Sequence, residues 1–232
     1  MSHYTVAVFH RKDQNIEELL APYSENLKVE PYISFSRQEA IDYARKHYKG
    51  YEDKSDEECW QFMADDAGDG MTDEDGNIYS TYNPLSKWDW WSEGGRWSGM
   101  LTRHGKEVDS GRVGDLEFSL DKECYEDCLR FWDVAIDHKP AEPGEEYSTF
   151  FKEEYYRDYY GDRETYARHQ AQFSTFAVLT PDGEWHEKGR MGWFGCSSET
   201  PEEAKDWEEH YRERFIDSAD PDWILTIVDC HI

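Results

Sequence analysis

Two strongly apolar segments lie near the ends of the chain, at 4–10 (YTVAVFH) and 223–229 (WILTIVD). Both are rich in β-branched and aromatic residues, which predicts buried strands. A third apolar strand is predicted over 173–179, and a turn at 181–183 (PDG) leads into a returning strand over 184–187. Because the first and last strands are the most apolar, we expect them at the centre of one sheet, with the chain ends close together.

Helix starts are marked by three pairs of capping residues, Ser36 with Glu39, Ser55 with Glu58, and Thr200 with Pro201. Apolar residues spaced by three and four predict a helix over 122–137, and a Tyr-rich, charged stretch over 147–172 also favours helix. Weaker strands are expected over 28–35, which contains Pro31, and over 77–82. These elements predict an α+β protein, an antiparallel sheet with helices packed on one face.

We expect residues 1–232 to form a single domain, with a helical excursion at about 122–172. The linker at 140–144 (PAEPG) could divide two domains. The strands before and after it would then lack partners, which favours one domain.

The charge balance limits the function. The chain has 52 Asp and Glu against 25 Lys and Arg, a formal charge of −27, so it should repel nucleic acids rather than bind them directly. Ten Trp, 16 Tyr and 11 Phe oppose disorder, because acidic disordered segments are poor in aromatic residues. No apolar run of membrane-spanning length and no export signal occur, and the five cysteines are odd in number, which predicts a cytoplasmic protein with reduced thiols.

A Trp-rich segment stands apart from this acidic background. Four of the ten tryptophans lie within 88–97, and residues 84–114 hold five bases and four acids. Two consecutive glycines there permit positive φ angles and an anion-binding nest of backbone amides. The candidate ligand-binding residues are Lys87, Trp88, Trp90, Trp91, Gly94, Gly95, Arg96 and Trp97. The alternative is structural: the rings alternate into a core, the glycines form a turn, and Arg96 pairs with a carboxylate.

Three pieces of this region, 76–84 (GNIYSTYNP), 86–90 (SKWDW) and 94–99 (GGRWSG), carry a resemblance. They are similar to uncharacterised proteins of bacteriophages and bacterial mobile elements, and more loosely to phage and plasmid proteins with a ferredoxin-like domain and a Trp-Asp-Trp motif. The resemblance implies a ferredoxin-like core with a helical insertion. It also implies an accessory protein in the cytoplasm of a bacterial host, and it attaches no activity to the motif.

Two functions follow as hypotheses. Residues 51–80 hold 11 acids and one base, and the expected partner-binding face consists of Asp56, Glu57, Asp65, Asp66, Asp69, Asp73, Glu74 and Asp75. Such a face could occupy the channel of a basic host protein, a nucleic-acid enzyme or a defence nuclease, as anti-CRISPR inhibitors do. The alternative is a binder of, or enzyme acting on, a small anionic or aromatic, nucleotide-like ligand at the Trp-rich segment. A particle component is disfavoured by charge repulsion.

Metal and catalytic motifs are weak. A calcium loop would place Met71 at a ligand position that Met cannot fill, and Cys124 and Cys128 share a helical face without a second ligand pair. The Cys230-His231 pair lacks an identifiable orienting group for a nucleophile. We therefore predict no metal, no cofactor and no catalytic residue, and favour a non-enzymatic role while leaving an enzyme open.

Overall fold

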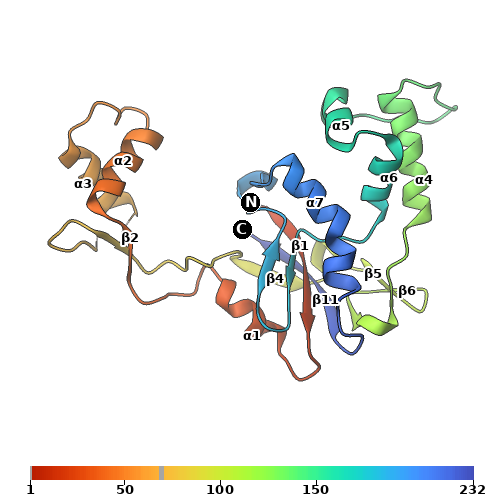
Figure 1. Ribbon diagram of the computed structural model, residues 1–232, viewed down its shortest axis with the longest axis horizontal. Helices are drawn as coiled ribbons and strands as arrows, with labels where there is room; N and C mark the ends of the chain where they lie inside the picture. The colour runs from red at the N-terminus through yellow and green to blue at the C-terminus, as the bar shows by residue number, and fades with distance from the viewer. Residues whose placement is uncertain (1, 68–70) are drawn as a thin grey trace. The chain divides into compact units, whose positions relative to one another are not determined.

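The computed structural model describes residues 2–67 and 71–232, and the chain divides into two compact units. The larger unit comprises Met1–Leu20 and Trp88–Ile232, and the inserted unit comprises Ala21–Lys87. Within the described residues there are seven α-helices, a mixed six-stranded sheet, a three-stranded sheet and a two-stranded sheet (Figure 1). The α+β class predicted from the sequence is confirmed at this level.

The six-stranded sheet belongs to the larger unit. Its strands are β1 (His3–His10), β4 (Trp90–Glu93), β7 (Ser110–Arg112), β9 (Ala177–Leu179), β10 (Trp185–Glu187) and β11 (Ile224–His231). The order is β10-β9-β1-β11-β4, with β7 pairing elsewhere along β11. β1 is antiparallel to β11 but parallel to β9, so the sheet is mixed rather than antiparallel as predicted.

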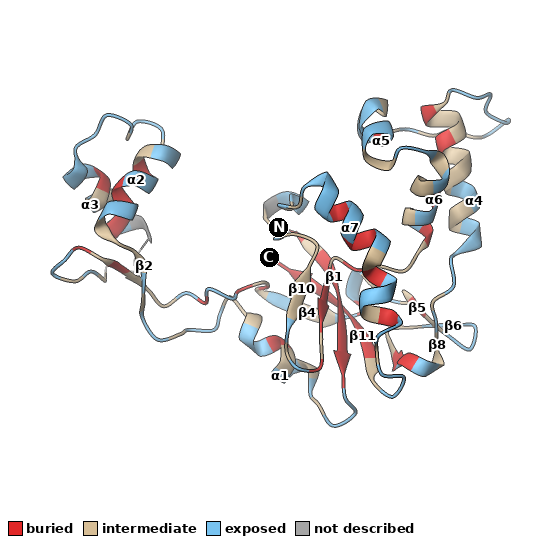
Figure 2. Cartoon of the chain, viewed as in Figure 1, coloured by how far each residue is buried: buried red, intermediate tan, exposed pale blue. Residues whose placement is uncertain are grey.

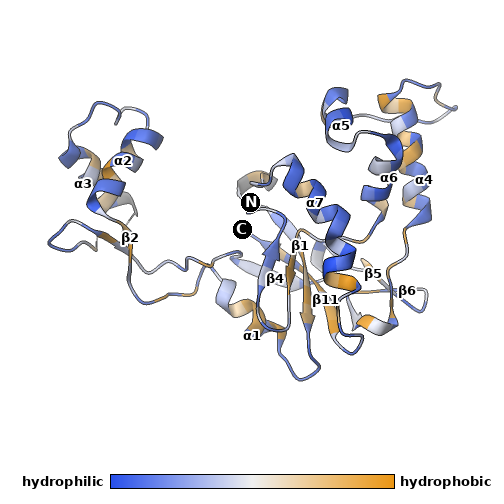
Figure 3. Cartoon of the chain, in the orientation of Figure 1, coloured by the Kyte–Doolittle hydropathy of each residue, from blue (hydrophilic) through white to orange (hydrophobic). Residues whose placement is uncertain are grey.

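The two long strands β1 and β11 lie side by side at the centre of the sheet, as predicted from their apolar sequences (Figures 2 and 3). Seven of the eight residues in each are buried. Beyond them, Ser2 and Ile232 exchange two backbone hydrogen bonds of 2.9 and 3.0 Å. The expected closeness of the chain ends is confirmed.

Helix α7 (Pro201–Tyr211) packs on one face of this sheet. The predicted capping box at Thr200 and Glu203 forms, with Pro201 in the first turn. The helix continues as a short π-helix over Arg212–Ile216. Trp207 and Tyr211 of α7 share the main core with residues from the central strands, including Ala7, Phe9, Val178, Leu225 and Ile227.

The predicted helical excursion contains three helices, α4 (Lys122–Phe131), α5 (Glu153–Tyr160) and α6 (Arg163–Ala171). α4 continues as a π-turn over Trp132–Ile136, while the stretch predicted over 147–172 is broken at Gly161, where φ is 76°. Trp132, Ile136 and Tyr156 form a small core of their own. The remaining elements of the larger unit are α1 (Ile16–Leu20) and a three-stranded sheet of β5 (Leu101–Arg103), β6 (Lys106–Val108) and β8 (Leu116–Glu117).

The inserted unit has its own core, formed where α2 (Arg37–His47) and α3 (Asp56–Ala67) pack together. Both predicted capping boxes form, at Ser36 with Glu39 and at Ser55 with Glu58. β2 (Tyr32–Phe35) pairs with β3 (Ile78–Ser80). β2 is shorter than predicted and begins directly after Pro31, which has no N–H to donate to a ladder.

Short 3₁₀ turns complete the secondary structure, at Ala21–Tyr23, Gly95–Trp97, Val113–Asp115 and Trp193–Gly195. None of the helices in the described part of the chain combines the length and the apolar character that crossing a bilayer requires.

Candidate functional site

The structure distributes the eight residues of the predicted ligand site among different environments. The buried or half-buried members are Trp88, Trp91, Gly94 and Trp97. The exposed members are Trp90, Gly95 and Arg96. The last member, Lys87, ends the inserted unit, where its N–H donates to the carbonyl of Tyr23 (2.7 Å).

Two of the tryptophans serve the fold. The indole N–H of Trp88 donates to the carbonyl of Leu20 at 3.3 Å, and Trp97 packs against the main core. Trp91 and Trp90 are neighbours on β4 and therefore point to opposite faces of the sheet. Only Trp90, 44% exposed, presents its ring widely to solvent.

The two glycines form a turn with positive φ, 66° at Gly94 and 55° at Gly95. The backbone N–H of Arg96, the next residue, donates to Oδ2 of Asp229 at 3.1 Å. A methyl group added at Gly95 would lie 2.5 Å from this same oxygen. The turn therefore aims one backbone amide, that of Arg96, at a carboxylate of the protein itself, while the N–H of Gly94 donates to the carbonyl of Ile227.

Asp229 connects this turn to a histidine. Its Oδ1 lies 2.8 Å from Nδ1 of His3, and the Asp229 side chain is only 3% exposed. A second pair of the same kind lies beside it, in which Nδ1 of His231 is 2.6 Å from Oδ1 of Asp89. In both pairs a carboxylate fixes the orientation of an imidazole through Nδ1, and the side chains of His3 and His231 are 15% and 7% exposed.

The rings of His3, Trp90 and His231 touch one another, and we call them the His3–Trp90–His231 cluster. Trp90 stacks on His231 with ring centroids 5.2 Å apart and planes 16° from parallel. His3 meets both edge-on, at 4.9 Å from His231 and 5.3 Å from Trp90. The cluster joins strands β1, β4 and β11, because His3, His231 and Trp90 are paired across the sheet.

Sequence reasoning missed most of this cluster. His3, Asp89 and Asp229 were not candidates, and His231 was considered only with Cys230. Cys230 lies on the opposite face of β11 and is buried, and burial raises the pKa of its thiol well above the usual value. The orienting group for His231 is Asp89, inside the Trp-Asp-Trp motif. The available signal was positional: His3 and His231 lie just outside the two strands predicted to be neighbours, 4–10 and 223–229.

The predicted acidic face lies on the inserted unit and is partly neutralised. Asp56 pairs with Arg45 at 2.6 Å and Glu57 pairs with Arg37, while both carboxylates stay 68% exposed. Asp65 accepts a hydrogen bond from the neighbouring Gln61. Asp69 lies outside the described residues, and Asp66 is placed only by its backbone in α3.

The remaining acids of this face form a fixed turn. Asp73 accepts hydrogen bonds from the backbone N–H groups of Asp75 and Asn77 and from the side chains of Asn77 and Tyr79. These bonds, those from Asn77 first, lower the pKa of Asp73. Glu74 and Asp75 are exposed in the turn that Asp73 holds.

Comparison with known proteins finds no match to this chain among protein-family models, curated proteins or solved structures. The resemblance carried by the Trp-rich motif therefore stays a prediction.

Proposed function

We propose that the chain binds a small anionic ligand with a planar ring at the His3–Trp90–His231 cluster. The observation that carries this proposal is the exposed ring of Trp90, held in place by its stack on His231. An indole fixed in this way loses little freedom when a ligand stacks on it, and stacking of a nucleobase contributes about 1–3 kcal/mol.

The histidines supply the polar part of the proposed site. Each imidazole is held by a carboxylate at Nδ1. With the proton on Nδ1, Nε2 is an acceptor, and it donates to an anionic group only when both ring nitrogens carry a proton. The exposed Arg96 lies in the turn that holds Asp229, and the segment around it is locally basic in an acidic chain. This composition suits a ligand that combines an aromatic ring with a phosphate or carboxylate.

A panel of nucleoside monophosphates tests the proposal, with the indole and imidazole signals followed by NMR. We expect the Trp90 and His231 signals to shift, and Trp90→Leu to weaken binding at least about tenfold. His210→Gln is the matched control, because His210 also pairs with an aspartate, Asp206, but lies exposed on α7. Undiminished binding in folded Trp90→Leu would overturn the proposal, as would the absence of any shift at millimolar ligand.

We also propose that the acidic face of the inserted unit binds a basic host protein, a nucleic-acid enzyme or defence nuclease that it inhibits. The support is the exposed pair Glu74 and Asp75 in a turn fixed by Asp73. Asp56 and Glu57 add to it, since exposed ion pairs are worth little and a partner's cations can replace Arg45 and Arg37.

Charge reversal tests the second proposal. Bacterial proteins captured on the chain should be released by salt and by competing duplex DNA, and the double variant Glu74→Lys, Asp75→Lys should lose them. The control, Glu202→Lys with Glu213→Lys on α7 and its π-turn, changes the charge equally and should retain them. Equal capture of bacterial proteins by the double variant and by its control would contradict the second proposal.

The ferredoxin-like core is likewise proposed rather than established. It is supported by β1 lying between a parallel strand, β9, and an antiparallel one, β11, with α7 packed on one face. In a ferredoxin-like β-α-β-β-α-β chain, the corresponding edge strand precedes the strand that pairs with the first one in parallel. Here the edge strand β10 follows that parallel strand, β9. A solved structure of a related protein in which the edge strand precedes the strand equivalent to β9 would support the ferredoxin-like core.

A further inference from the structure

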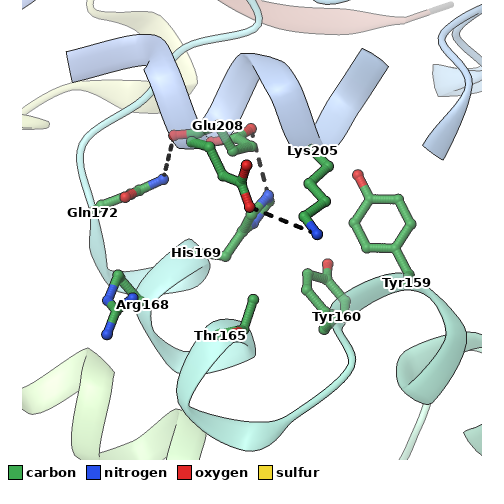
Figure 4. A pocket seen from close by; sticks show the side chains of 9 residues that line it. Tyr159, Tyr160, Thr165, Arg168, His169, Gln172, Lys205 and Glu208 are labelled. Carbon is green, nitrogen blue, oxygen red and sulfur yellow. Dashed lines mark hydrogen bonds and ion pairs between the residues drawn. The ribbon is translucent and has the colours of Figure 1, made fainter. Parts of the chain in front are cut away.

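A separate cleft of about 200 Å³ lies in the larger unit, between α6 with the end of α5 on one side and α7 on the other (Figure 4). It shares no residue with the His3–Trp90–His231 cluster. It brings together acidic, basic and aromatic side chains from three helices. Such a convergence of polar groups in one cavity is the ordinary sign of a ligand site.

The floor of the cleft is formed by Glu208 and His169, which face each other in Figure 4. The Glu208 side chain is only 6% exposed, and its Oε2 accepts a hydrogen bond from Ser174 at 2.6 Å. Its Oε1 lies 4.0 Å from Nε2 of His169 and 3.6 Å from Nζ of Lys188, both beyond hydrogen-bond distance. Oε1 therefore keeps its capacity to accept.

Nε2 of His169 is a buried polar atom with no hydrogen-bond partner among the described residues. Leaving such an atom unpaired destabilises the fold, so its persistence calls for an explanation. Burial lowers the pKa of this imidazole, which keeps it neutral near pH 7. A neutral imidazole and a carboxylate 4.0 Å apart can both bond to adjacent polar atoms of one planar group.

The charge of Glu208 already faces Lys188, so a ligand ammonium at Oε1 would be repelled by that lysine. An uncharged N–H donor avoids this repulsion. The amino and ring nitrogens of a purine have this character, since they present uncharged donors and acceptors side by side.

The walls and mouth of the cleft fit the rest of a nucleotide. The ring of Tyr160 lies 5.3 Å from the His169 ring and 4.6 Å from the ring of Tyr159. Burial raises the pKa of Tyr159 to about 12, so its hydroxyl remains a neutral donor. Arg168 makes no ion pair within the described residues, and Lys205 only approaches Glu209 at 3.7 Å. Both cations are available to a phosphate.

We propose that this cleft binds a purine nucleotide, with the base on Glu208 and His169 beside Tyr160, and the phosphate on Arg168 and Lys205. The tautomer of His169 decides which purine fits. A proton on Nε2 makes a donor beside an acceptor and matches adenine, whereas a lone pair there makes two acceptors and matches guanine.

Calorimetric titration of the full chain carrying Trp90→Leu, which removes the stacking ring of the other proposed site, with AMP, GMP and their nucleosides tests the proposal. We expect one of the two nucleotides to bind, and Glu208→Gln to weaken it at least about tenfold, because an amide nitrogen would then face the base. Arg168→Met and Lys205→Met should each bring nucleotide affinity closer to nucleoside affinity. Lys106→Met, which removes an exposed cation on β6, is the matched control.

If Glu208→Gln fails to fold, the variants Arg168→Met and Lys205→Met still test the proposal, because both side chains are exposed. No binding by either nucleotide at millimolar concentration would overturn the proposal. Unchanged binding in Arg168→Met and Lys205→Met would do the same. Trp90→Leu should leave binding in the cleft unchanged, so failure at one site is distinguishable from failure at the other.

Discussion

His3 and His231 stand directly opposite each other on β1 and β11, with ring centroids 4.9 Å apart. Each is tied by Nδ1 to its own aspartate, Asp229 for His3 and Asp89 for His231. Because each ring has its own carboxylate, the two imidazoles are oriented independently at one end of the sheet. The Trp-rich motif contributes to both pairs, through Asp89 and through the turn that holds Asp229.

Asp229→Asn should destabilise the protein by about 1–3 kcal/mol, because a buried acceptor of two hydrogen bonds is replaced by a group that presents an N–H to one of them. Urea unfolding measures the change. Asp206→Asn, at the exposed pair with His210, should cost less than ~1 kcal/mol. Equal losses in the two variants would mean that the Arg96–Asp229–His3 connection adds no stability.

Gly95→Ala should lower the melting temperature more than Gly105→Ala does. Both glycines have positive φ, 55° and 68°, so both substitutions carry the left-handed penalty of about 1–2 kcal/mol. A methyl group at Gly95 also collides with Asp229, whereas nothing lies within 4 Å at Gly105. The difference between the two melting curves isolates the collision, and similar curves would show that Asp229 moves aside at no cost.

Acidification should destabilise the fold partly through His169. Burial lowers its pKa below 6.5 in the folded state, opposed by Glu208 and aided by Lys188, so the unfolded chain binds the proton more readily. The stability this histidine contributes is present above pH 6.5 and is lost as pH falls from there through its folded pKa. His169→Gln should flatten the unfolding free energy against pH in that window, and an unchanged slope would contradict the shift.

Thiol labelling at pH 8 should be fast at Cys196 alone among the five cysteines. Cys196 is exposed, while Cys59 and Cys230 are buried, and burial raises the pKa of Cys128 to about 12. The thiolate is the reactive form, so burial protects Cys59 and Cys230 and the raised pKa protects Cys128. Cys124 is half-buried, and its thiol donates to the carbonyl of Gln170 at 3.7 Å. Cys196→Ser should abolish the fast phase in an Ellman assay, and a remaining fast phase would indicate that a buried thiol opens to solvent.

Local signals predicted the local structure well. The capping box at Ser36 begins α2 where expected, because its hydrogen bonds involve residues three apart and depend on nothing distant. The parallel pairing of β1 with β9 could not be predicted in this way. It depends on the course of the long chain between His10 and Ala177, which no short pattern encodes.

The cluster required information of another kind, the register between strands. The apolar run over 223–229 predicts a buried strand, but not which residue of β1 each of its residues meets. Trp90 reaches His231 only because β4 pairs with β11 in one particular register. The cleft at Glu208 could not be predicted either, because nothing in the sequence of a charged helix shows that one of its glutamates is buried.

The hydrogen-bonded ends of the chain have a practical consequence for anyone handling the protein. Ser2 and Ile232 hold each other directly beside His3 and His231, so a purification tag fused at either end would emerge next to those histidines. A polyhistidine tag there would add its own imidazoles to the very signals that report ligand binding. A tag in the exposed stretch at 141–144 would leave that end of the sheet free.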